Sequence, residues 1–224
     1  MNTRGLYRRF WLPLYRRWVL RYQRRERTYR YAGLRLRVPP GVFHPGLYFS
    51  TPVMLRFLAT RDLRDKTLLD VGTGSGLLAL YAARQGASAT ALDLHPLAAT
   101  TARRNAAANG LPLDVLESDL FEALAPGRSF EVVLVNPPYY PLAPRRIEEH
   151  AFYAGEQLEY FQRFFAGLGA VLAPGGHCWM VLSEDCAIER ISGIARSFGW
   201  GWETVFERKK WGESLFVVEI GRVG

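Results

Sequence analysis

The fold is decided by one short stretch of the chain, which reads TLLDVGTGSGLLAL from residue 67 to residue 80. An apolar run, residues 67–71, leads into the glycine-rich segment Gly72-Thr73-Gly74-Ser75-Gly76, and a helical stretch from Leu77 to Gln85 follows. Glycine permits a tight turn and a close approach of the backbone to a ligand, and a helix N-terminus offers free N–H groups. The stretch therefore predicts a strand, a ligand-binding turn and a helix.

The next two units of the chain each end in an acidic residue. Residues 89–93 form an apolar run that ends in Asp93, 21 residues after Gly72. This spacing is typical of a carboxylate that accepts from the ribose hydroxyls of a nucleoside cofactor. In the unit 113–120 we expect Asp119 to accept from an adenine amino group and Leu120 to cover the ring. A phosphate-binding P-loop is disfavoured, because no Lys-Ser or Lys-Thr follows the last glycine.

The motif Asn136-Pro137-Pro138-Tyr139, which we call the clamp motif, points to a reaction as well as a fold. A planar NH2 group is a poor nucleophile and has to be held in position. The Asn136 side-chain oxygen and the Pro137 carbonyl can accept its two N–H hydrogens, and the prolines fix the backbone that aims them. Tyr139 is expected to stack on the planar group. By itself, the motif is equally compatible with a plain turn after a buried strand.

Together these units favour methyl transfer from S-adenosylmethionine to an NH2 nitrogen. We expect a direct in-line displacement that needs no strong base and draws most of its rate from orientation in a dry site. A nicotinamide dehydrogenase would explain the first two units but has no use for the clamp motif. A noncatalytic binding protein that retains the cofactor fold is the alternative from another class.

These motifs give the chain a resemblance to a known family. From about Val38 to its end it resembles the HemK-type protein-glutamine N5-methyltransferases, above all the short form without the large N-terminal domain. The likeness rests on residues 69–76, Asp93, residues 118–120, the clamp motif and residues 151–155. It implies catalytic roles for Asn136, Pro137 and Tyr139. The resemblance and the motifs together give the expected cofactor-binding residues Thr51, Asp70, Gly72, Thr73, Gly74, Gly76, Asp93, Asp119, Leu120 and Asn136.

One departure from the family pattern lies ahead of the glycine loop. The family usually carries an acidic residue and a Thr shortly after a Pro. Here Thr51 can be matched, but Ser50 stands at the place of the acid, and two residues are inserted after Pro45. We therefore expect a protein glutamine amide as the acceptor, with the N6 nitrogen of adenine in RNA or DNA as the alternative, because related amine methyltransferases use the same clamp.

The alternation of apolar strand and helix candidates predicts an α/β fold with a doubly wound sheet. The resemblance implies that this is the seven-stranded, Rossmann-like sheet of class I methyltransferases. Two domains are expected: a basic, aromatic-rich arm over residues 1–37 and a methyltransferase domain over residues 38–224. Further helices are expected at 53–59, 96–109, 157–171 and 186–198, and further strands at 132–135, 177–182 and 215–220.

The arm concentrates positive charge. Residues 1–37 hold twelve Arg against one acid, Glu26, so the arm carries +11 and the rest of the chain about −3 of the total formal charge of +8. Interleaved aromatic residues suit RNA or a ribosome surface, and a basic helix with a Trp-rich face suits an anionic membrane surface. The alternative is that the arm folds over its own domain, because Leu34, Leu36 and Val38 alternate with arginines like a half-buried strand.

The apolar runs and the cysteines of the chain bear on membrane insertion, metal binding and cellular location. The longest apolar run of the arm, residues 10–15, is far below the roughly 18 residues that a membrane span needs. Cys178 and Cys186 make no metal-binding spacing, so we expect no metal and a cytoplasmic enzyme with reduced, buried thiols. No oligomeric state is predicted.

Overall fold

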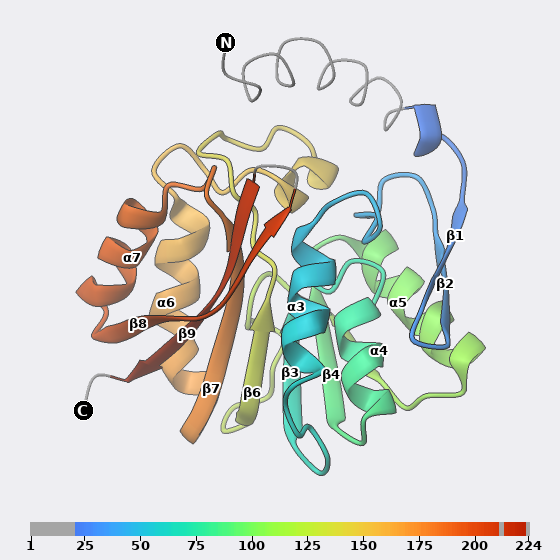
Figure 1. Cartoon of the computed structure of the whole chain (residues 1–224), viewed down its shortest axis with the longest axis horizontal. Helices are drawn as coiled ribbons and strands as arrows, with labels where there is room; N and C mark the ends of the chain where they lie inside the picture. The colour runs from blue at the N-terminus through green and yellow to red at the C-terminus, as the bar shows by residue number, and fades with distance from the viewer. Residues whose placement is uncertain (1–20, 211–212, 223–224) are drawn as a thin grey trace.

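A computed structural model of the chain describes residues 21–210 and 213–222. Its centre is a seven-stranded sheet with the order β5-β4-β3-β6-β7-β9-β8, flanked by helices on both faces (Figure 1). Neighbouring strands from β5 to β7 are parallel, and β9 runs antiparallel to both β7 and β8. The predicted doubly wound, seven-stranded fold is confirmed.

The first half of the described chain holds the hairpin and the first cofactor-binding units. Its elements are β1 (Arg27–Tyr31), β2 (Leu34–Val38), α3 (Ser50–Leu58), β3 (Thr67–Val71), α4 (Leu77–Arg84), β4 (Ser88–Asp93), α5 (Pro96–Asn109) and β5 (Asp114–Glu117). The second half holds β6 (Phe130–Val135), the 3₁₀ helix η2 (Ile147–Ala151), α6 (Glu159–Val171), β7 (Leu172–Ser183), α7 (Ile188–Ser197), β8 (Trp200–Lys210) and β9 (Glu213–Arg222).

Alternate side chains of the central strands build two separate cores. On β6, Val132 and Leu134 face a core shared with α3, α4 and α5, whereas Val133 and Val135 face a core shared with α6 and α7. Successive side chains of a strand point to opposite faces of the sheet, so a strand covered on both faces must be apolar throughout. The uninterrupted apolar sequence of β6 thus reflects a sheet with helices on both faces.

The order of the strands creates the crevice where ligands bind in such folds. From β3 the chain proceeds outward to β4 and β5, then returns to β6 on the other side of β3. Ligands of open α/β sheets bind at the carboxyl ends of the strands where the order reverses. The glycine loop after β3 and the clamp motif after β6 are therefore neighbours at this switch point.

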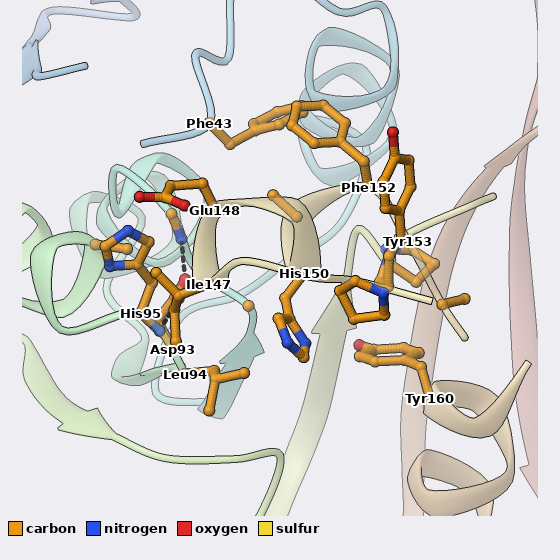
Figure 2. Close-up of a pocket in the computed structure, with 18 of the residues that line it drawn as sticks. Phe43, Asp93, Leu94, His95, Ile147, Glu148, His150, Phe152, Tyr153 and Tyr160 are labelled. Atoms are coloured by element: carbon orange, nitrogen blue, oxygen red, sulfur yellow. Dashed lines mark hydrogen bonds between the residues drawn. The ribbon is translucent and has the colours of Figure 1, made fainter. Parts of the chain in front are cut away.

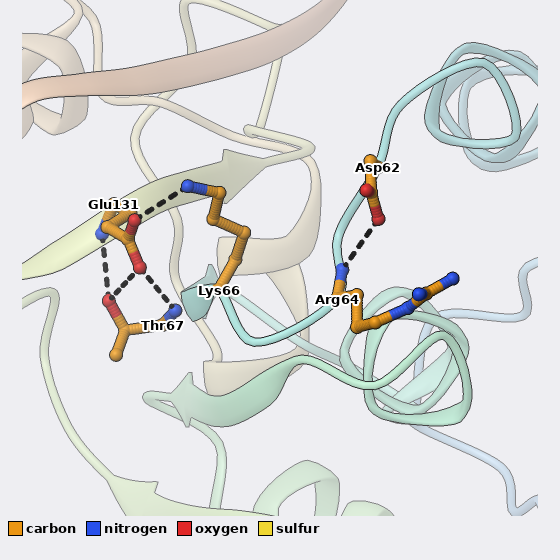
Figure 3. A network of polar contacts seen from close by, with 5 residues as sticks. All are labelled: Asp62, Arg64, Lys66, Thr67 and Glu131. Atoms are coloured by element: carbon orange, nitrogen blue, oxygen red, sulfur yellow. Dashed lines mark hydrogen bonds and ion pairs between the residues drawn. The ribbon is translucent and has the colours of Figure 1, made fainter.

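At the opposite end of these two strands, a polar network fixes their starts to each other (Figure 3). The Glu131 carboxylate accepts hydrogen bonds from Lys66 Nζ at 2.8 Å and from the Thr67 backbone N–H at 3.0 Å. The Thr67 hydroxyl accepts in return from the Glu131 backbone N–H at 3.0 Å. These contacts set the register of β3 against β6, and hence the relative height of their carboxyl ends.

The hairpin β1–β2 packs on α5 rather than standing apart from the domain (Figure 1). Leu34 and Leu36 are buried in the same core as α3, α4 and α5. The expected boundary between residues 37 and 38 thus falls inside β2, and the arm folds over its own domain at least from Arg27 onward. Residues 1–20, which carry the expected Trp-rich part of the arm, lie outside the described residues.

Two asparagines of α5 attach the exposed edge of β2. Asn105 accepts from the Arg37 N–H at 2.9 Å and donates to the Arg37 carbonyl at 3.1 Å, and Asn109 does the same with Arg35 at 2.9 Å each. Asn105 also donates to the Ser75 carbonyl in the glycine loop at 2.9 Å. The two amides thus replace a missing partner strand and connect the hairpin to the loop.

Most expected elements are present, with ends shifted by a few residues. β7 begins earlier than expected, at Leu172, because residues 173–176 form an irregular extension between the pairs Phe130↔Leu172 and Val132↔His177. The strand β8 was not expected from the sequence. It lies at the sheet edge and is rich in charged residues, so it lacks the continuous apolar run that identified the central strands.

We expect Asn105→Ala to lower the free energy of unfolding by about 2–4 kcal/mol, because it leaves the part-buried backbone groups of Arg37 and the buried carbonyl of Ser75 without partners. Asn109→Ala, whose bonds to Arg35 are exposed to solvent, should cost about 1 kcal/mol or less. Urea denaturation of both variants measures the difference. Equal losses of unfolding free energy in the two variants would contradict the expectation that the contacts of Asn105 stabilise the fold more than those of Asn109.

Candidate active site

A buried carboxylate holds the glycine loop in shape. Asp70, at 1% exposure, accepts from the Thr73 hydroxyl at 2.6 Å and from the Ala79 N–H at 3.3 Å. Burial raises the pKa of Asp70 to about 6, against the opposing effect of these two hydrogen bonds. Gly76 has a φ of 86°, and a Cβ there would lie 3.1 Å from the Ala102 side chain. Only glycine fits both the turn and the close approach of α5.

The carboxylate of Asp93 lies at the end of β4, on one side of the cavity (Figure 2). One oxygen accepts from the Gly74 N–H at 2.7 Å and the other from the His95 N–H at 2.9 Å. Burial raises the pKa of Asp93, and these two N–H groups oppose the rise. Each carboxylate oxygen can accept a second hydrogen bond, so Asp93 can hold the loop and a ribose together.

The third acidic unit is braced by residues on either side of it. Leu120 has a φ of 50°, a conformation that is costly for a branched residue, and the Ser118 hydroxyl donates to the Leu120 carbonyl at 2.8 Å. The Asp119 carboxylate pairs with Arg163 of α6 at 2.9 Å. This unit therefore presents Leu120 to the cavity in a strained turn, a feature that tends to mark ligand-binding positions.

In the clamp motif, the Tyr139 hydroxyl donates to the Asn136 side-chain oxygen at 2.9 Å, and the Asn136 NH2 donates to the Thr51 hydroxyl at 3.4 Å. Burial raises the pKa of the Tyr139 phenol, so it stays protonated and remains a donor. The backbone N–H groups of Tyr139 and Tyr140 both donate to the Phe152 carbonyl. The Asn136 amide is thus held on both sides, and its oxygen keeps one lone pair for an acceptor group.

These groups line a cavity of about 460 Å³ at the switch point of the sheet. Phe43 and Tyr48, from the segment between β2 and α3, stack with ring centroids 4.5 Å apart. Phe152 lies against both rings, at 6.1 and 5.7 Å, and Tyr160 lines the opposite wall (Figure 2). A largely apolar cavity of this size with a few fixed polar groups suits a nucleoside ligand.

The structure divides the predicted cofactor-binding residues into two groups. Those that line the cavity are Gly72, Gly74, Asp93, Asp119, Leu120 and Asn136. Thr51, Asp70, Thr73 and Gly76 lie behind it and hold the loop or the Asn136 amide. All three predicted catalytic residues, Asn136, Pro137 and Tyr139, line the cavity.

Roles for Arg163 and for the three aromatic side chains that cover the cavity were not predicted from the sequence. Phe43, Tyr48 and Phe152 lie in irregular segments whose sequences give no periodic signal, and Arg163 is 44 residues from its partner Asp119. The predicted role of Tyr139 as a stacking ring took no account of its hydroxyl. The only available signal was that Tyr, unlike Phe, can donate a hydrogen bond from the same position.

The residues that line the cavity match the chemical groups of S-adenosylmethionine. The Asp93 carboxylate can accept from ribose hydroxyls, and Leu94 and Leu120 provide apolar surface for a purine ring. A Cβ at Gly72 would meet no protein atom within 4 Å, so the space before the loop is open to a ligand. Among the described residues, no His, Cys, Asp and Glu side chains gather as a metal site.

The fold and the site define a class I methyltransferase, an enzyme that uses S-adenosylmethionine. The chain belongs to the methyltransferase small domain family, whose model matches residues 33–211. Of the helices that the structure describes, none combines the length and the apolar character that crossing a membrane requires.

Two curated relatives carry the family assignment further. A Methanocaldococcus jannaschii protein, provisionally named a protein N5-glutamine methyltransferase, is 33% identical over 197 residues, covering 85% of this chain and 97% of its own length. The release factor glutamine methyltransferase of Deinococcus radiodurans is 37% identical over 160 residues. That match covers 65% of this chain but 56% of the bacterial enzyme, so this chain corresponds to little more than half of it.

Among solved structures, the T. thermophilus 16S rRNA N2 guanine methyltransferase in complex with AdoMet and guanosine superposes with a TM-score of 0.66. It is 23% identical, and the match covers 89% of this chain and 50% of that one. This likeness establishes the shared fold.

We expect the Asp70 carboxyl to make stability depend on pH. It ionises near 3.8 in an unfolded chain and near 6 in the folded protein, so the folded state binds more protons between these values. Its contribution is therefore most favourable below about pH 4 and is lost as the pH rises through 6, a change of roughly 2–3 kcal/mol.

Asp70→Asn should remove this decline in urea denaturation at several pH values. Asp114→Asn, at an exposed position, is the control, and a decline that persists in Asp70→Asn would contradict the assignment.

We expect Tyr139→Phe to lower kcat about tenfold while leaving the affinity for S-adenosylmethionine unchanged, because it removes one hydrogen bond that orients Asn136 and keeps the ring. Calorimetry and steady-state kinetics measure the two quantities. Tyr31→Phe, on the hairpin, is the matched control. An unchanged kcat in Tyr139→Phe would show that the hydroxyl does not position the amide.

Proposed function

We propose that this enzyme methylates the side-chain amide nitrogen of a glutamine in a protein. The observation that carries the proposal is the oriented Asn136 amide, which lines the cavity and whose oxygen accepts, among the described residues, from the single donor Tyr139. A carboxamide NH2 offers two N–H donors in one plane. The Asn136 oxygen and the Pro137 carbonyl are acceptors at neighbouring positions of the same motif, and they match that group.

Bound S-adenosylmethionine supplies a methyl group on a positively charged sulfur. The residues of the chain orient the acceptor nitrogen and exclude water. Asn136 and Pro137 accept its N–H hydrogens, which leaves the lone pair directed away from them. Phe43, Tyr48 and Phe152 cover the cavity, where a hydrogen bond to a fixed acceptor is stronger than in water. Orientation of this kind can contribute about 7–11 kcal/mol to lowering a barrier.

The rim of the cavity supports a protein acceptor over a nucleic acid. Tyr140, Leu142 and Ile147 are large apolar residues with 46%, 51% and 40% of their surfaces exposed, and Tyr140 and Ile147 line the cavity itself. Contiguous exposed apolar residues typically mark contacts with proteins. Glu148 and Glu156 also line the cavity, and their charges would repel a phosphate backbone.

Family relationship supports the same acceptor, because the two curated relatives described above are named for protein glutamine methylation. The proposal includes a cytoplasmic location. Both cysteines, Cys178 and Cys186, are buried and unpaired, as is usual for proteins that fold in a reducing compartment.

We expect the full-length protein to transfer a labelled methyl group from S-adenosylmethionine to the protease-sensitive fraction of a cell extract, with N5-methylglutamine as the labelled amino acid after complete enzymatic digestion. Asn136→Ala should reduce this transfer about 100-fold or more, while calorimetry shows cofactor affinity nearly unchanged, because the amide acts mainly on the acceptor in the transition state. Label in the nuclease-sensitive fraction would instead identify an adenine acceptor. Near-normal turnover by Asn136→Ala would contradict the mechanism.

A further inference from the structure

The hairpin β1–β2 presents two chemically different faces. Tyr29, Tyr31, Leu34 and Leu36 point inward and pack against the core shared with α3, α4 and α5. The outward face carries exposed side chains at Thr28, Arg30, Arg35 and Arg37. In the register of the hairpin Arg30 lies directly opposite Arg35, and Thr28 directly opposite Arg37.

This outward face, defined as Thr28, Arg30, Arg35 and Arg37, is poorly neutralised. Like charges directly opposite each other on a sheet destabilise it. Within the described part of the chain, the guanidinium groups of Arg30 and Arg35 have no acidic partner. Among the described residues, Glu26 is the acid that pairs with this face, and it makes its short contact with Arg104 at 2.6 Å and only a long one with Arg37 at 3.9 Å. The outward face can therefore bind an anion that comes from outside the chain.

The face is also held rigidly in place. Asn105 and Asn109 fix the backbone of Arg37 and Arg35 to α5. The turn at Ala32 and Gly33 has positive φ at both residues, 45° and 77°, and the Arg84 guanidinium lies against Gly33. The arginines thus stand on a fixed two-stranded platform rather than on a free tail.

We propose that this outward face binds the phosphate backbone of RNA, as a docking surface separate from the methyl-acceptor site. Arg35 and Arg37 are two residues apart on one strand, a separation of about 7 Å that resembles the distance between successive phosphates of a nucleic-acid strand. Arginine also binds phosphate with two parallel hydrogen bonds. The arginine of the cavity lining, Arg163, is instead paired with Asp119 and Glu122, so the outward face of the hairpin is the better match to a phosphate backbone.

The side chains of the face favour RNA over the other anionic surfaces. Binding to a membrane surface requires apolar side chains that insert between the lipids, and Tyr29 and Tyr31 of this hairpin point inward instead. Thr28 adds a hydroxyl beside Arg37, which can exchange hydrogen bonds with a ribose 2′-OH. DNA, which lacks that hydroxyl, and anionic lipid vesicles are therefore the comparison ligands.

The test uses the full chain and the double variant Arg30→Gln/Arg35→Gln. Its binding to a fluorescently labelled RNA stem-loop is measured by anisotropy over a series of salt concentrations. Loss of two phosphate contacts should reduce the slope of log affinity against log salt by about 1.4–1.8, and lower the affinity on the order of tenfold or more at about 0.1 M salt. The melting temperature should stay the same or rise, because two opposed like charges are removed, and cofactor affinity and glutamine methylation should stay unchanged.

The control is Arg190→Gln/Arg208→Gln, which removes the same charge from exposed positions on α7 and β8. This variant should bind RNA with the slope of the unaltered protein. An unchanged slope in the hairpin variant, or an equal decrease in both variants, would overturn the proposal. So would a larger loss of binding to a DNA duplex or to phosphatidylserine vesicles than to RNA.

Discussion

The Asp70 carboxylate, buried at the end of the central strand β3, is the contact on which the site depends. It accepts from Thr73 in the glycine loop and from Ala79 in the first turns of α4, so it fixes the angle between strand, loop and helix. The N–H groups of Gly72 and Thr73 then reach the carbonyl of Leu92 at 2.9 Å each. One buried carboxylate therefore sets the position of the loop against β4, and burial raises its pKa to about 6.

The topology of the sheet brings the other parts of the site next to this fixed loop. Asp93 binds the Gly74 N–H, which ties the end of β4 to the loop. Asn136 follows β6, the strand on the other side of β3, and the paired register of β3 and β6 brings its amide to the same edge. The cavity thus lies where three parallel strands end, which is the position that open α/β sheets use for ligands. The aromatic side chains of Phe43, Tyr48 and Phe152 cover this cavity.

The molecule separates its two kinds of surface chemistry. The cavity is lined by apolar residues, by Glu148 and Glu156, and by an arginine that is paired with Asp119, and we propose that it receives a protein glutamine. The hairpin carries arginines on its outward face, where we propose that an RNA backbone binds. Asn105 joins the two regions mechanically, because it binds Arg37 on the hairpin and Ser75 in the glycine loop. Its position explains how the hairpin β1–β2 is built into the methyltransferase fold.

The sequence by itself determined the class of fold and the chemistry of the site. Residues 132–135 identified a strand, and residues 72–76 and 136–139 identified the turns that follow β3 and β6, because these signals are local and depend on backbone conformation. Only the tertiary structure decided which residues face the ligand. Asp70 and Thr73 turn inward to hold the loop, Arg163 meets Asp119 across 44 residues, and the hydroxyl of Tyr139 orients Asn136. The edge strand β8 and the docking of the hairpin were likewise decided by packing. Such contacts depend on distances between segments far apart in the chain, and a pattern of neighbouring residues carries no information about them.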